Sequence, residues 1–241
     1  MVDALVIAGC LSGEKNDAGI APLVEELAAA VGSDVTVRAR TGGRPVGQSL
    51  PEALVDLRRR GVRRALVVTT HVADGRLQRE AASAVRDASP DFESLRLAPP
   101  LLATEKDLEL VSRALDAAVP ARVGSVVALA GHRGTECEAA LARLEGALSA
   151  AGRSDVFVGA PAALAERLVA RPECEVLLGP FLMALGHHAR HDVLGSLRDE
   201  LARRGVNVTS WPHSLAELPA IRALVVDHAC VTMIQKGTVP F

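Results

Sequence analysis

The chain has 241 residues, of which 49% are apolar and 23% charged, and its formal net charge at pH 7 is −2. These values indicate a globular protein with one large or two smaller domains, and they exclude a disordered chain. Nucleic-acid binding usually needs a basic surface, often with aromatic side chains for stacking. With one Trp, four Phe and no Tyr, we expect no nucleic-acid partner.

The four cysteines are far apart and form no CxxC pair: Cys10, Cys137, Cys174 and Cys230. This spacing argues against a structural zinc site or a disulfide framework, so we expect a reducing, cytoplasmic setting. The residues before Cys10 resemble a lipoprotein cleavage box. We reject a signal peptide, because Met1–Asp3 is acidic and only Ala4–Ala8 is apolar. No apolar run approaches the roughly 20 residues that span a bilayer, so no membrane partner is expected.

Short apolar runs typical of buried strands alternate with longer helical patterns in the first half of the chain. The expected strands, in chain order, are Ala4–Ala8, Asp34–Ala39, Ala65–Thr69 and Leu95–Ala98. Helices are expected at Ile20–Val31, Pro51–Arg60 and Leu77–Ala88, and from Thr104, where Asp107 completes a capping box. Four such β–α units predict a parallel sheet covered on both faces.

The pattern restarts after a linker at Val119–Arg122. The next expected strands are Ser125–Ala130, Asp155–Val158, Glu175–Leu178 and Val206–Thr209, and a last helix is expected over Leu218–Met233. We therefore predict an α/β fold with two similar, doubly wound lobes, residues 1–120 and 121–215, the second with a histidine cluster. Composition does not determine whether the last helix, about residues 216–235, packs back on the first lobe.

Two pairs of loops support an internal duplication. Ala8–Glu14 matches Ala130–Glu136 at an offset of 122 residues, and His71 and His187 follow the third strand of each half at an offset of 116. Ligands bind at the carboxyl ends of parallel strands, so we expect a binding cleft between the lobes. The loops expected to line it are Gly9–Asp17, Arg40–Gly47, His71–Arg76, Gly131–Glu136 and Gly186–Asp192.

Histidines are concentrated in two of these loops. His187, His188 and His191 lie within five positions after an apolar strand, and His132 follows the first strand of the second half. Neutral imidazoles from two loops could hold a divalent ion and leave positions open for another ligand, or move protons. The alternative is that one histidine caps a helix, that others are solvated and that His132 bonds to backbone.

Glu136 is four residues after His132, so the two share a face if a helix has already begun. Glu136 would then orient the imidazole; the alternative is a first-turn acid that favours the helix dipole. Six arginines lie on or beside the loops: Arg38, Arg40, Arg44, Arg76, Arg133 and Arg190. Guanidinium groups suit a ligand with several carboxylates, and the alternative is a set of solvated charges. No phosphate-binding loop occurs, so no nucleotide is expected.

On these residues the chain resembles the anaerobic, type II sirohydrochlorin cobaltochelatases, class II chelatases related to ferrochelatase. Thr70–Gly75 is similar to that family's Leu-His-x-x-x-Gly segment, and Ala130–His132 to its Met-Gly-His. Leu182–Ala189 is similar to Leu-Met-Leu-Val-Ala-Gly-Asp-His-Ala, and Pro219–Ala223 to Pro-Ala-Ile-Arg-Ala. The resemblance covers most of the chain in the same order.

The resemblance implies a bilobal chelatase that inserts a divalent metal ion into a tetrapyrrole such as sirohydrochlorin, in cobalamin or tetrapyrrole biosynthesis. Co²⁺ is the expected substrate ion, with Fe²⁺ and Ni²⁺ as alternatives. His132 and His188 match the family's metal- and proton-handling pair, and His187 is expected as a further metal ligand. The expected substrate-binding residues are Arg40, Arg44, His71, Arg76 and Arg133, and Glu136 is the expected second-shell carboxylate beside His132.

The chain also departs from the family pattern. Arg76 and Leu77 stand where the family has acidic residues, Val158–Ala162 lacks the family's glutamate, and His187 replaces an aspartate. This leaves open a different metal preference or a non-catalytic carrier that binds a tetrapyrrole or a metal on the same fold. A small-molecule-binding protein with no metal role is a third hypothesis. The oligomeric state is not determined, and a homo-oligomer stays open.

Overall fold

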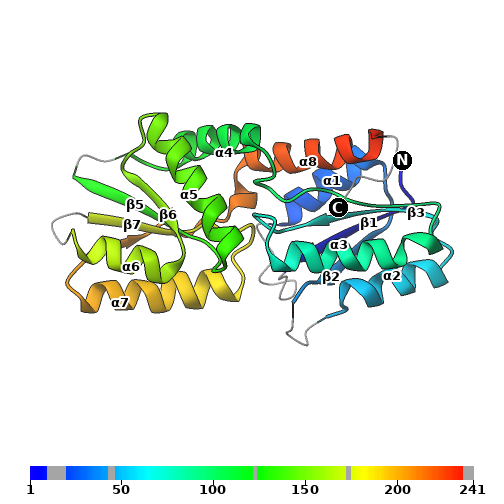
Figure 1. Ribbon diagram of the computed structural model, residues 1–241, viewed down its shortest axis with the longest axis horizontal. Coiled ribbons are helices and arrows are strands. Elements are labelled where there is room, and N and C mark those ends of the chain that lie inside the picture. Colours follow the sequence, from blue (N-terminus) through cyan, green and yellow to red (C-terminus); the bar gives the residue numbers. More distant parts are fainter. Residues whose placement is uncertain (10–19, 43–46, 122–123, 172–174, 236–241) are drawn as a thin grey trace. The chain divides into compact units, whose positions relative to one another are not determined.

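The computed structural model describes residues 1–9, 20–42, 47–121, 124–171 and 175–235. The chain forms two compact units (Figure 1): the first holds Met1–Ala103 and the chain from Arg222 onward, and the second holds Thr104–Ile221. Each unit contains a four-stranded parallel sheet. None of the described helices combines the length and the apolar character that crossing a membrane requires.

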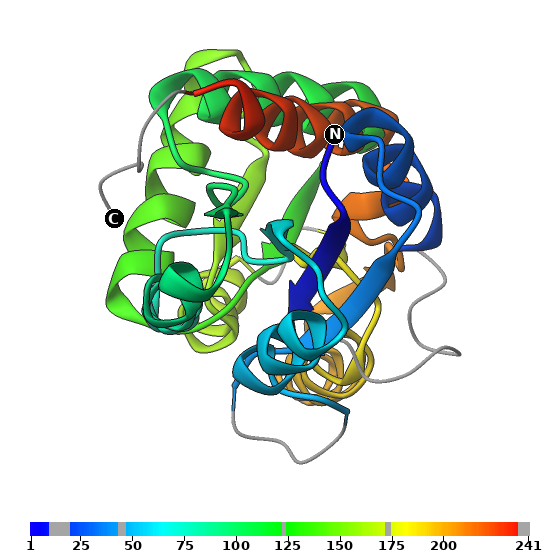
Figure 2. The ribbon, with the colours of Figure 1, turned by 90° about the vertical axis from the view of Figure 1, so that its right-hand side faces the viewer.

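The first unit is a sheet of strand order β2–β1–β3–β4 with helices on both faces. Its strands are β1 (Ala4–Gly9), β2 (Thr36–Arg40), β3 (Arg64–Thr69) and β4 (Ser94–Leu97). Its helices are α1 (Ala21–Val31), α2 (Leu50–Arg59), α3 (Arg76–Ala88), the short η2 (Ser89–Asp91) and most of α8 (Pro219–Ile234). Alternate residues of β1 share a core with α2 and α3, whereas α1 and α8 cover the other face (Figures 1 and 2).

The second unit repeats this arrangement with strand order β6–β5–β7–β8. Its strands are β5 (Ser125–Ala130), β6 (Val156–Gly159), β7 (Glu175–Pro180) and β8 (Asn207–Ser210). Its helices are α4 (Glu105–Ala118), α5 (Thr135–Ala150), α6 (Pro161–Val169), the π-helix η3 (His188–Leu197), α7 (Arg198–Arg203) and η4 (Leu215–Glu217). Because α6, η3 and α7 share one core with β5 and β7, they cover one face of the sheet.

The expected strands all occur, and their bounds differ from the predicted ones by one or two residues at most. The two sheets have the same strand order, which confirms the predicted pair of similar lobes. Backbone hydrogen bonds beyond the strand ends are repeated as well. The Thr70 N–H donates to the Ala8 carbonyl (2.9 Å), and the Phe181 N–H donates to the Ala130 carbonyl (2.8 Å).

His71 is not the counterpart of His187, so that part of the predicted duplication is wrong. The His71 carbonyl accepts from the Leu101 N–H (3.1 Å), whereas the bond at the same place in the second unit joins the Leu182 carbonyl to the Leu215 N–H (2.9 Å). The equivalent of His71 is therefore Leu182. In the second unit the histidines His187 and His188 lie further along the loop, at the start of η3.

Helices α4 and α8 each follow the fourth strand of one repeat, yet each belongs to the unit formed around the other repeat. The capping box of Thr104 and Asp107 starts α4 as predicted, and α4 pairs with α5 through Glu105 and Arg143. In the first unit Arg222 of α8 donates to Glu26 of α1 (2.7 Å). The compact units therefore divide at 103/104 and 221/222, whereas the sequence repeat suggested a boundary at 120/121.

Arg153 holds α4 to the strand edge of the second unit. Its side chain is 9% exposed and forms two hydrogen bonds to the Asp155 carboxylate, at 2.9 and 3.0 Å. It also donates to Asp116 Oδ1 (3.0 Å) and to the Val119 carbonyl (3.2 Å) at the end of α4. The Nε and both Nη groups of Arg153 donate to acceptors of the same unit, so the buried guanidinium has hydrogen-bond partners in place of water.

We expect Arg153→Ala to lower the free energy of unfolding by about 2–3 kcal/mol, because it leaves acceptors of a buried, charge-assisted network unsatisfied. Urea unfolding followed by circular dichroism measures this loss. Arg143→Ala is the matched control: it removes an exposed pair between α4 and α5 and should cost less than about 1 kcal/mol. Equal losses for the two variants would contradict the role of Arg153.

Candidate functional site

The loop after β5 carries His132 at the carboxyl edge of the second sheet. The Gly131 N–H donates to the Gly159 carbonyl of β6 (2.9 Å), which holds the loop against the sheet. A side chain at Gly131 would force Leu141 of α5 to shift, because its Cβ would lie 2.8 Å from Leu141 Cδ1. The Gly-His sequence therefore lets α5 pack closely on the strand end while His132 stays half-buried at the edge.

The loop after β7 brings His188 to the same edge, since β7 is the parallel neighbour of β5. His188 is the first residue of the π-helix η3, whose residues Ala189, Val193 and Leu197 are buried. The wide turn of a π-helix is uncommon and occurs often at functional sites. Gly195 helps the chain adopt it, because a Cβ there would be only 3.2 Å from the Arg190 carbonyl oxygen.

His132 and His188 form an edge-to-face pair with ring centroids 5.3 Å apart and planes at 81°. His188 Nδ1 lies 2.6 Å from Asp192 Oδ2, one helical turn further along η3. An ionised carboxylate can only accept, so Nδ1 carries the proton and Nε2 carries the lone pair. That lone pair is the one that could bind a metal ion or a proton.

The electrostatics favour an ionised Asp192. Partial burial acts to raise the pKa of Asp192, but the hydrogen bond from His188 and the charges of His188, His187 and Arg133 outweigh it and leave the pKa below its ordinary value. Arg133 is exposed and lies in the loop of His132. This arrangement favours a negatively charged Asp192 carboxylate beside His188.

His187 and His191 lie beside this pair and are both exposed. The His187 ring centroid is 6.2 Å from that of His188 and 4.3 Å from that of His191. Within the described part of the chain, no three His, Cys, Asp or Glu side chains gather as a ready metal site. The expected set of three ligands, His132, His187 and His188, is thus not gathered around one point, because the His187 ring packs toward His191.

The start of helix α5 bears on the expected relation between His132 and Glu136. Helix α5 begins at Thr135, so His132 precedes it and helical spacing does not relate His132 to Glu136. Glu136 is an exposed first-turn acid, and it is Glu138 whose Oε1 accepts from the Gly134 N–H at the helix start (3.0 Å). Arg190 donates through Nε to the Leu185 carbonyl (2.8 Å), so it braces the loop before η3.

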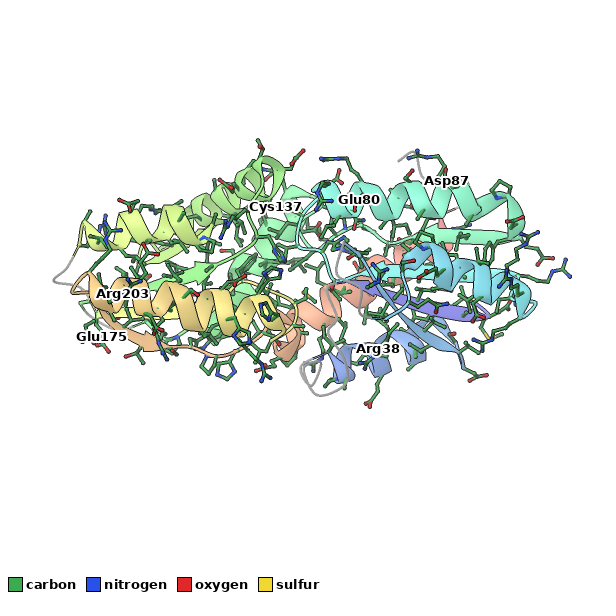
Figure 3. The ribbon with its side chains drawn as sticks, turned by 90° about the horizontal axis from the view of Figure 1, so that it is seen from below. Arg38, Glu80, Asp87, Cys137, Glu175 and Arg203 are labelled. Carbon is green, nitrogen blue, oxygen red and sulfur yellow. The ribbon has the colours of Figure 1, made fainter. Side chains whose placement is uncertain are left out.

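Figure 3 shows the two ends of this unit. Cys137 in the first turn of α5 lies at the end where the strands finish, and Glu175 and Arg203 lie at the opposite end, where β7 starts and α7 stops. The histidine loops follow β5 and β7, so they belong to the same end as Cys137. This is the end at which open α/β sheets bind their ligands.

In the first unit, both ring nitrogens of His71 have hydrogen-bond partners. Nδ1 lies 2.9 Å from Gln78 Oε1, and Nε2 lies 2.8 Å from Thr41 Oγ1. Gln78 Oε1 also accepts from the Thr69 hydroxyl, so the amide oxygen faces His71 and Nδ1 donates to it. Burial lowers the pKa of His71, and the Gln78 bond and the Glu80 charge offset only part of that effect. His71 is therefore a neutral residue within a polar network.

The expected substrate-binding arginines differ in what they contact. Arg40 donates to the Gly47 and Gly42 carbonyls, each at 2.9 Å, so it closes its own loop. Arg76 pairs with Glu80 on the exposed face of α3. Arg44 and the loop Gly9–Asp17 lie outside the described residues, and Arg133 is the arginine beside the histidine pair.

Three polar residues of these networks were not predicted: Asp192, Gln78 and Thr41. The four-residue spacing between His188 and Asp192 is a signal for helical neighbours and could have identified Asp192. Thr41 is 30 residues from His71 and has no such signal, because only the pairing of β1 with β2 and β3 brings the two loops together.

Solved structures of sirohydrochlorin chelatases share the fold of this chain. SirB of Bacillus subtilis with Fe³⁺ matches with a TM-score of 0.64 and 13% identity over 97% of this chain and 96% of its own. The sirohydrochlorin chelatase SirB of Bacillus subtilis subspecies spizizenii, in complex with cobalt, matches with a TM-score of 0.65 and 13% identity over 96% and 95%. CbiX, from siroheme biosynthesis in denitrifying bacteria, matches with a TM-score of 0.58 and 18% identity over 97% and 100%.

The family model of the cobalt chelatase CbiK matches residues 32–234, so the chain belongs to this family. The sirohydrochlorin cobaltochelatase of Salmonella typhimurium is 29% identical over 196 residues, which is 73% of this chain and 71% of that protein. The resemblance to the cobaltochelatases is thereby confirmed, and so is the prediction of a metal chelatase with an α/β fold.

The lowered pKa of His71 predicts a pH dependence of stability. Since the pKa of folded His71 lies below its ordinary value of 6.5, the unfolded chain binds the proton more readily, and stability should fall as pH drops below about 6.5. His71→Gln, which cannot titrate, should show a smaller fall when thermal unfolding is compared at about pH 8 and pH 5.5.

His213→Gln is the control for this experiment, because His213 is exposed and bonded to the Glu217 carboxylate (2.8 Å). In the His213→Gln variant, the loss of stability on acidification that is due to His71 should remain. If His71→Gln and the wild type lost the same stability on acidification, the neutral state of His71 would not be a source of the pH dependence.

Proposed function

We propose that the chain inserts Co²⁺ into sirohydrochlorin, with His132 and His188 as the residues that deliver the ion and accept protons. The observation that carries the proposal is the edge-to-face pair of these two imidazoles, with Asp192 behind His188, in a member of the cobalt chelatase family. The cytoplasm, which the cysteine spacing favours, is the proposed location.

The reaction exchanges two protons for one ion. Two pyrrole N–H bonds break, the macrocycle nitrogens bind Co²⁺, and two protons leave for bases and then for water. An imidazole that holds Co²⁺ through Nε2 does so with the lone pair that would otherwise accept a proton. Once the ion passes to the macrocycle, the same lone pair is available for a pyrrole proton. No redox step or nucleotide is required.

Asp192 supports both stages of this exchange. Its carboxylate holds the Nδ1–H of His188, which directs Nε2 away from η3 and makes it a better ligand. When His188 takes a proton, the adjacent negative charge stabilises the imidazolium. Asp192 thus supplies a carboxylate to a site where Val158–Ala162 lacks the glutamate of the family pattern.

Sirohydrochlorin carries several carboxylates, and arginine is the side chain best suited to bind them. We propose Arg133 as the first contact, because it is exposed and follows His132 directly. Arg76 could exchange its surface partner Glu80 for a substrate carboxylate at little cost. Arg40 is bonded to its own loop, and we propose that it shapes that loop rather than binding substrate.

A carrier that binds the tetrapyrrole or the ion without turnover is the second candidate. The missing glutamate after β6 favours it. Anaerobic absorbance spectroscopy of purified protein with sirohydrochlorin and Co²⁺ separates the two functions. Repeated conversion to the metalated spectrum, faster than without protein, supports the chelatase. A stoichiometric spectral change with metalation at the uncatalysed rate would instead support the carrier.

In this assay we expect His132→Ala and His188→Ala to lower the insertion rate by about 10²–10⁴-fold, the usual contribution of a positioned acid or base. His213→Ala is the matched control, since His213 is an exposed histidine with a carboxylate partner four residues away. Full activity in folded His132→Ala and His188→Ala variants would exclude the proposed roles.

Asp192→Asn should lower kcat for insertion by roughly 10–100-fold, as loss of a carboxylate that orients a ligating histidine usually does. Asp192→Glu should restore part of the rate, because it returns the negative charge. The thermal unfolding midpoint should change little, since Asp192 is only partly buried. Asp199→Asn, in the same helical segment and paired with Arg198, is the control and should retain the wild-type rate.

A further inference from the structure

We propose that His187 and His191 form a second, exposed metal site, which captures a divalent transition-metal ion and passes it to the His132–His188 pair. Capture of the ion by these two side chains does not depend on the proposed function. The transfer step rests on the proposed function, and the experiments below separate the two.

The geometry of the pair supports a shared ion. His187 and His191 are four residues apart at the start of η3, and their ring centroids are 4.3 Å apart with planes at 32°. Two histidines at this spacing on one helix face can ligate the same metal ion. Both side chains are exposed, so an ion can reach their ring nitrogens from solvent without disturbing a core.

The pair lies beside the proposed insertion site. The His187 ring is 6.2 Å from the His188 ring, which is in turn 5.3 Å from His132. The rings also change in exposure along this series, since His187 and His191 are exposed, whereas His188 and His132 are half-buried. An ion held by His187 can therefore reach His188 by exchange of one imidazole for the next.

Some charged groups near His187 and His191 attract a cation, and others repel it. The Asp192 carboxylate, which is bonded to His188, attracts a cation to this end of η3. Arg190 lies on the same helical segment, but its guanidinium is bonded to the Leu185 carbonyl. Arg133, in the loop of His132, adds a positive charge near Asp192. Since these positive charges offset the attraction of the carboxylate, the imidazoles themselves must supply most of the affinity.

The ligands define the class of ion. Imidazole nitrogens suit Co²⁺, Ni²⁺ and Zn²⁺, whereas Mg²⁺ and Ca²⁺ prefer oxygen ligands. Two protein ligands leave the other positions of the ion to water, so the ion can be released again. A transient site of this kind is what loading of an insertion pair requires. It would also explain why His187 stands where the family pattern has an aspartate.

Co²⁺ binding to the whole chain tests the capture step. We would titrate Co²⁺ alone, anaerobically, by isothermal titration calorimetry into the wild type, His191→Ala, His132→Ala, the double variant and the His213→Ala control. Loss of a group that only orients a metal ligand weakens binding by roughly 10–100-fold, and loss of a ligand should cost at least as much. We expect His191→Ala and His132→Ala each to remove a different binding event, and the double variant to remove both.

If His191→Ala bound Co²⁺ with the affinity and stoichiometry of His213→Ala, the capture site would be disproved. Exposed substitutions should not impair folding, and circular dichroism verifies this. His187→Asn, which removes the other ligand and should weaken the same binding event, is an independent second test. Unchanged binding in His187→Asn as well would overturn the proposal completely.

The insertion assay tests the transfer step. His191→Ala should raise the KM for Co²⁺ by about tenfold or more, while kcat falls less, because an ion already bound at His188 reacts as before. A KM equal to that of His213→Ala would exclude transfer even if capture were observed. A chain that binds Co²⁺ at His187 and His191 but shows no insertion would overturn the proposed function and leave the capture site in place.

Discussion

The parallel pairing of β5 with β7 is the constraint on which the histidine site depends. These strands are the two central ones of the second sheet, paired from Ser125 with Glu175 to Ala130 with Pro180. Both strands therefore end at one edge, and the two loops that follow are neighbours although His132 and His188 are far apart in the chain. Close packing at Gly131 then limits where His132 can lie.

The π-helix η3 is the second feature on which the histidine site depends. A side chain at the start of a helix has many orientations, and a carboxylate one turn later selects one of them. In η3 the buried residues Ala189, Val193 and Leu197 anchor the wide turn to the sheet, so His188 and Asp192 remain together at the edge. The hydrogen bond from His188 and the nearby charges hold the pKa of Asp192 below its ordinary value, against the effect of partial burial.

The two repeats have diverged in chemistry while keeping their backbone. The same hydrogen bonds close the loops after β3 and β7. In the first unit a histidine at that point is bonded to Thr41 and Gln78, and its pKa is lowered. The second unit has Leu182 there and places its histidines further along, where they are more exposed. The exchange of α4 and α8 between the repeats links each unit to both halves of the sequence.

The sequence by itself determined the strands, the two similar lobes and the family, because hydrophobic periodicity and short motifs are local signals. It also predicted His132 and His188 as site residues, and the structure brings their rings together. The tertiary structure decided which sheet α4 and α8 cover, that His71 corresponds to Leu182, and that Asp192 is bonded to His188. These features depend on packing between segments far apart in the chain and on where a helix begins. Neither can be read from residue spacing, since the same pattern is compatible with either sheet and with a helix start several residues away.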